Sequence, residues 1–138
     1  MIKPHGSDTL DPRFVYDTER HHALTKEAGS LPSLLLNSAA AANAVMLGAG
    51  YFNPLKGYMN RADALGVAAT LHTTAGLFWP VPVLNLTIDA TAIRGATRIA
   101  LRDPNVEGNP VLAIQTVEAI EEFTEAEISA MAEKIFRT

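Results

Sequence analysis

Apolar residues along this chain fall into short runs, separated by clusters of Pro, Gly, Asn and Asp. The apolar run after a proline in residues 31–37, LPSLLLN, predicts a strand. Apolar positions alternate over residues 97–102 and recur over 110–120, and the turn-forming stretch DPNVEGNP between them predicts a hairpin. Residues 77–88 also alternate, and two prolines near their start predict a strand at the edge of a sheet.

An alanine-rich segment, residues 38–50, predicts a helix because alanine has the highest helix propensity. Asn37 or Ser38 can cap its beginning, since a side-chain oxygen accepts from the unpaired N–H groups of the first turn. Gly48 or Gly50 can end it in a left-handed conformation.

Two further helices are predicted over residues 61–72 and 124–138. Asn60 is placed to cap the first of them. The second opens with a capping box, in which the Thr124 side chain bonds the N–H of Glu127 and the Glu127 side chain reaches back.

Residues 1–30 show no apolar period, and we interpret them as an extended arm followed by a solvated, charged loop. Strands and helices do not alternate along the remainder of the chain. This order predicts an α+β domain with a mainly antiparallel sheet or open barrel and three or so helices.

Composition narrows the class of protein. The chain has 138 residues, 48% hydrophobic and 19% charged, which is typical of one globular domain. Its net charge of −4 and the lack of a basic stripe argue against nucleic acid as a partner. There is no cysteine, no signal-peptide pattern and no apolar run long enough for a membrane span. We therefore expect a cytoplasmic protein with no membrane partner.

Motifs that carry chemistry are missing. The glycines at 48 and 50 fit the start of G-x-G-x-x-G, but Asn53 stands where the third glycine belongs. His21 and His22 are adjacent and would point in different directions, so we interpret them as part of the solvated loop rather than a metal pair. No catalytic, cofactor-binding or metal-binding residue is predicted in this chain.

Several motifs in order resemble the N-terminal region of ATP sulfurylase (sulfate adenylyltransferase). GAGYFNPLKGYM at 48–59 resembles the family pattern G-G-[YF]-x-P-L-x-G-[FY]-M. IKPHG at 2–6, FWPVPVLNL at 78–86 and RIALRDPNVEGNPVLAIQTVEAI at 98–120 are similar to further family segments. EAEISAMAEKIFRT, at the end of the chain, resembles the family helix that precedes [VI]-[FY]-x-T.

The resemblance implies a PUA-like N-terminal domain that lacks its last strands and is followed by a nucleotidyltransferase domain. The full enzyme joins ATP, bound with magnesium, and sulfate to give adenylyl sulfate and pyrophosphate. Its catalytic pattern Q-x-R-N-x-x-H-x-x-H is missing here, since Gln115 is followed by Thr116, Val117 and Glu118. We therefore expect residues 1–138 to be inactive alone and to pack against the catalytic domain of the same enzyme.

The stretch at 48–60 allows two interpretations. In the first it is a packed corner of the fold, anchored by three apolar side chains: Phe52, Leu55 and Met59. In the second it is a surface for the catalytic domain, and the candidate contact residues are Asn53, Lys56 and Tyr58. Two alternatives for the whole chain are a free-standing PUA-like RNA-binding module and a scaffold that forms homo-oligomers.

Overall fold

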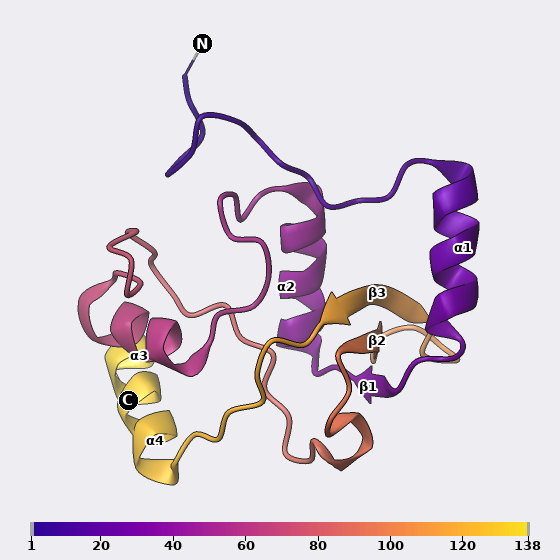
Figure 1. Cartoon of the computed structure of the whole chain (residues 1–138). Helices are drawn as coiled ribbons and strands as arrows, with labels where there is room; N and C mark the ends of the chain where they lie inside the picture. Colours follow the sequence, from indigo (N-terminus) through magenta and orange to yellow (C-terminus); the bar gives the residue numbers. More distant parts are fainter. Residues whose placement is uncertain (1, 138) are drawn as a thin grey trace. The chain divides into compact units, whose positions relative to one another are not determined.

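The structure is a computed structural model that describes residues 2–137 (Figure 1). Its α-helices are α1 (Thr18–Ala28), α2 (Ser38–Ala49), α3 (Arg61–Thr70) and α4 (Glu125–Phe136), with a short 3-10 helix η1 (Thr91–Ile93). Its strands are β1 (Ser33–Leu35), β2 (Arg98–Arg102) and β3 (Val111–Thr116). Two compact units are present: one runs up to Gly57 and includes Asn85–Ile120, and the other comprises Tyr58–Leu84 and the segment from Glu121 onward.

The sheet of the first unit has the order β1-β2-β3. β2 and β3 form the predicted antiparallel hairpin, with Ile99 opposite Gln115. β1 pairs with β2 in parallel, Leu34 lying opposite Leu101. The α+β class is confirmed, but the sheet is mixed rather than mainly antiparallel. A parallel pair needs a long connection between its strands, and this pairing leaves no local pattern in the sequence.

Helix α1 corrects the interpretation of residues 18–28 as a loop. Asp17 caps it by accepting from the N–H of Arg20, and Lys26 lies in the last turn, where a positive charge suits the helix dipole. Glu27 also pairs with Arg98 of β2, with Nε–Oε1 at 2.7 Å. This helix buries little apart from Ala28, so it lacks the apolar period on which the sequence prediction relied.

The predicted strand at 77–88 was wrong. This stretch has an isolated bridge between His72 and Phe78 and is otherwise extended without ladder pairing. Pro80 and Pro82 lack N–H groups and cannot donate to a ladder. Val83 still contributes one backbone bond, accepting from the N–H of Met59 at 2.8 Å.

The other helix predictions are confirmed to within a few residues at their ends. Asn37, Asn60 and Thr124 cap α2, α3 and α4, and the capping box between Thr124 and Glu127 is complete. In the second unit, α3 contributes Ala64 and Val67 to the core and α4 contributes Met131.

Candidate functional site

The C-terminal end of α2 contacts both the following loop and the N-terminal arm. Gly50 ends the helix with φ 82°, and the N–H groups of Gly50 and Tyr51 bond the carbonyls of Leu47 and Met46. This arrangement satisfies two of the carbonyls that a helix leaves without internal donors. The Gly48 carbonyl is satisfied differently, by the N–H groups of Arg13 at 2.7 Å and Phe14 at 3.0 Å.

Asn53, a predicted contact residue, faces the N-terminal arm. Its Oδ1 accepts from the N–H of Asp11 at 3.2 Å, and its Nδ2 donates to the Ser7 hydroxyl at 2.8 Å. The peptide bond from Asn53 to Pro54 is cis. Asn53 therefore holds residues 7–11 in place, and both ends of its amide are already engaged within the chain.

Lys56 and Tyr58 differ in exposure and belong to different units. Lys56 is exposed in the first unit, whereas Tyr58 begins the second. Burial raises the pKa of the Tyr58 phenol to about 12. The structure therefore places the three predicted contact residues in different surroundings.

The three predicted apolar anchors also differ from one another. Met59 is buried, while Phe52 and Leu55 are half-buried. The packed-corner interpretation therefore describes Met59 well and the other two in part.

Sequence reasoning missed the arm residues Ser7, Asp11 and Phe14 as partners of this stretch. They lie 42 or more positions from Asn53 or 34 from Gly48, too distant for any periodic pattern. The sequence offered one signal of this contact, the glycine at position 48 within the predicted helix. Glycine inside a helix costs about 1 kcal/mol relative to alanine, and a second glycine follows at the cap.

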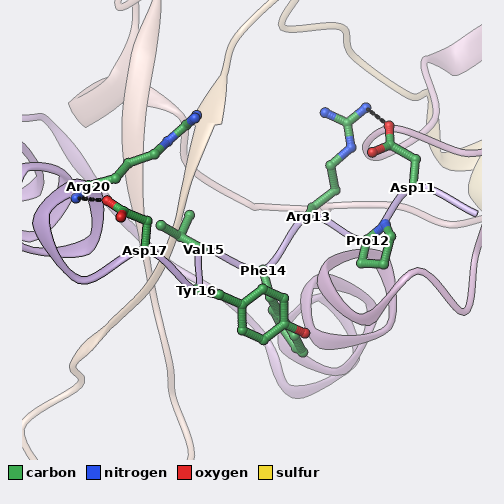
Figure 2. A pocket seen from close by; sticks show the side chains of 8 residues that line it. All are labelled: Asp11, Pro12, Arg13, Phe14, Val15, Tyr16, Asp17 and Arg20. Carbon is green, nitrogen blue, oxygen red and sulfur yellow. Dashed lines mark hydrogen bonds and ion pairs between the residues drawn. The ribbon is translucent and has the colours of Figure 1, made fainter.

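A shallow hollow of about 420 Å³ lies along the arm, lined by residues 11–17 and Arg20 (Figure 2). Arg13 and Arg20 project to one side of the arm in this view, and Phe14 and Tyr16 project to the other. Asp11 pairs with Arg13 at 3.3 Å, and Asp17 accepts from the N–H of Arg20. Two acids and two bases line the hollow, so it offers no excess of either charge to a ligand.

Neither a metal site nor a membrane span emerges from residues 2–137. Among them, no three His, Cys, Asp or Glu side chains come together in a way that could hold a metal ion. None of the helices they form is long and apolar enough to cross a membrane.

Comparison with known proteins gives a consistent result. The family model of the PUA-like domain matches residues 2–138. A sulfate adenylyltransferase of Alcanivorax borkumensis is 60% identical over 138 residues, and one of Allochromatium vinosum is 61% identical. In both cases all of this chain is covered.

Among solved structures, the hexameric APS kinase from Thiobacillus denitrificans matches with a TM-score of 0.71 and 36% identity. That match covers 91% of this chain and 24% of the other. The chain also spans only about a third of its two bacterial relatives, 34% and 35% of their lengths.

Proposed function

This chain belongs to the PUA-like domain family, and we propose that it serves as the non-catalytic N-terminal domain of a sulfate adenylyltransferase. The observation that carries the proposal is identity of 60% and 61%, over the full chain, to two sulfate adenylyltransferases. In this proposal ATP, magnesium and sulfate bind outside residues 1–138. The chain's role is to pack against the catalytic domain and support it.

Within that role the proposed contact residues divide by their surroundings. Lys56 is exposed and can pair with an acidic group of the catalytic domain. Asn53 acts indirectly, because its amide holds the arm. Tyr58 is half-buried and contributes through the apolar part of its ring.

A chimera tests the proposal directly. The 138-residue segment of the Allochromatium vinosum enzyme that matches this chain is replaced by it, and formation of pyrophosphate from ATP and sulfate is measured. We expect the chimera to retain activity within about tenfold of the parent enzyme, because 61% of the exchanged residues are identical in the two chains. The isolated chain should release no pyrophosphate above background.

Two outcomes contradict the proposal. Turnover by the isolated chain comparable to that of the whole enzyme would show that catalysis lies within these residues. A chimera that folds cooperatively, as shown by calorimetry, but has no activity would show that this chain does not support that catalytic domain.

A homo-oligomeric scaffold is the second candidate, favoured by the similarity to a chain described as a hexameric APS kinase. The two functions are compatible, since a domain can support its catalytic partner and also contact a second copy. Light scattering of the chimera, which measures its oligomeric state, tests whether the chain also acts as a scaffold. A scaffold role requires that the chimera's oligomeric state follow the inserted chain rather than the parent enzyme.

A further inference from the structure

The end of α2 and the loop that follows it show features of a peptide-binding site. The Gly48 carbonyl accepts from two successive backbone N–H groups, and Asn53 Oδ1 accepts from a third. All three donors belong to one extended segment, residues 11–14. Recognition of an extended segment through its main chain is how proteins commonly bind peptides.

A side-chain contact adds specificity to this recognition. A Cβ atom built on Gly48 would lie 2.5 Å from Cε1 and 2.8 Å from Cδ1 of Phe14. Both separations are below 3.0 Å, a distance at which non-bonded Cβ contacts essentially never occur. The Phe14 ring therefore occupies the space that any other residue at position 48 would fill.

A second glycine contributes in the same way. A Cβ atom built on Gly50 would lie 3.3 Å from the Cα of Pro12. Gly50 also needs its left-handed conformation to end α2, so two requirements coincide at this position. Gly48 has ordinary helical geometry, and contact with the arm is its distinguishing feature.

The segment bound at this site is not part of the core. Leu10 is 57% exposed and Phe14 is 46% exposed, and Asp11 and Pro12 are exposed as well. The contacts that attach the arm include four hydrogen bonds and the packing of Pro12 and Phe14 against Gly50 and Gly48. Such a segment can open locally at a free-energy cost well below that of global unfolding.

We infer that Gly48, Gly50 and Asn53 form a seat for residues 7–14 of the same chain, and that the seated arm is a strap that detaches as a unit. The seat therefore holds an extended peptide with an aromatic side chain, and this peptide belongs to the same chain. Detachment exposes the Gly48 face of α2, one turn from the already exposed Val45. This inference depends on contacts within the chain and not on the proposed enzymatic role.

The test uses Gly48→Ala in the complete chain, with hydrogen–deuterium exchange read at the amides of Arg13 and Phe14. The new methyl group displaces the Phe14 ring, so we expect exchange at these amides to be at least about tenfold faster. Tryptic cleavage after Arg13 should accelerate to a similar extent. Circular dichroism should remain unchanged, because alanine favours the helix more than glycine does.

Gly57→Ala is the matched control. A Cβ at position 57 meets nothing within 4 Å, and its φ lies outside the left-handed range, so exchange in the arm should be unaffected. In Phe14→Ala/Gly48→Ala the clash is removed. Exchange at Arg13 in this double variant should be no faster than in Phe14→Ala alone.

Two results would overturn the inference. One is wild-type exchange at Arg13 and Phe14 in Gly48→Ala, which would mean that the arm does not need the seat. The other is protection in the wild-type protein that increases with protein concentration. That result would assign the seat to the arm of a second copy rather than to the chain's own arm.

Discussion

Leu71 ends α3 in the left-handed conformation, with φ 60° and its N–H bonded to the carbonyl of Val67. For a residue with a branched side chain this conformation costs about 1–2 kcal/mol, whereas glycine adopts it freely. Glycine also loses more backbone entropy on folding, which offsets about 0.5–1 kcal/mol of the stability gained by removing that cost. We expect Leu71→Gly to raise the free energy of unfolding by up to about 1 kcal/mol, measured by urea denaturation.

Ala69→Gly, two residues earlier, provides the contrast. Ala69 is exposed within α3, so replacing it with glycine should lower the free energy of unfolding by about 1 kcal/mol. Opposite signs at positions 69 and 71 identify backbone conformation as the cause. A loss of stability in both variants would mean that the Leu71 side chain contributes more than its conformation costs.

At this scale the predicted contact of Asn53 with the catalytic domain stays a prediction. Asn53 was predicted as a polar contact residue, and it does make specific contacts, but with the arm. Its partners Ser7 and Asp11 lie 46 and 42 residues away along the chain. Contacts at such separations follow from the tertiary fold, and no local pattern of side chains encodes them.

At the scale of elements, Glu127 connects the beginnings of two helices. It completes the capping box of α4 with Thr124, and it accepts from the Arg61 guanidinium, with Nε–Oε2 at 3.2 Å. Glu121 also bonds to the first residue of α3, accepting from the backbone N–H of Arg61 at 2.8 Å. Bonding to the Thr124 N–H and to Arg61 lowers the pKa of Glu127 below its usual value of 4.5.

The pH dependence follows from the direction of this shift. A carboxyl group with a lowered pKa in the folded state stabilises the fold above its unfolded pKa. That contribution is lost as the pH falls below about 4.5 and through the lower folded value. Glu127→Gln should therefore be less stable than the parent at pH 7, and the difference should shrink on acidification, as followed by thermal unfolding.

Glu125→Gln controls for the loss of one negative charge in the same first turn of α4. It keeps the capping box and the contact with Arg61 intact. Its stability relative to the parent should therefore depend less on pH than that of Glu127→Gln. Equal pH profiles for the two variants would contradict the role assigned to Glu127.

Elements with local signals were predictable. Three helices begin at caps that can be read from the sequence, and the β2–β3 hairpin follows from alternation around a turn-forming stretch. α1 was missed because it has no apolar face, although Asp17 caps it in the same way as Asn and Thr cap the other three helices. The β1–β2 pairing was missed because more than 60 residues separate its strands.

At the scale of the whole molecule, the net charge argues against the alternative that the chain is an RNA-binding module. The net charge of −4 repels the phosphate backbone, and binding to nucleic acid depends largely on the release of counterions by basic side chains. We expect no shifted band when the chain is mixed with structured RNA at low and moderate salt. A band that appears at micromolar protein and weakens with salt would revive the RNA-binding alternative.

Several strongly exposed aromatic side chains lead us to expect self-association of the isolated chain. Tyr16 is 80% exposed, Tyr51 75% and Phe136 70%. Each of these rings would lose contact with water if another protein covered it. In the proposed enzyme the catalytic domain covers some of these side chains, so the isolated chain should self-associate as its concentration rises.

Light scattering from about 1 to about 500 µM measures this association, with the mean mass rising with concentration. Tyr51→Ser and Phe136→Ser remove exposed rings that contribute little to the core, so folding should be retained while association weakens. If neither substitution changes the association, the contact lies elsewhere on the surface. A strict monomer over the whole range would remove the support for a scaffold role and would leave the catalytic domain as the proposed partner.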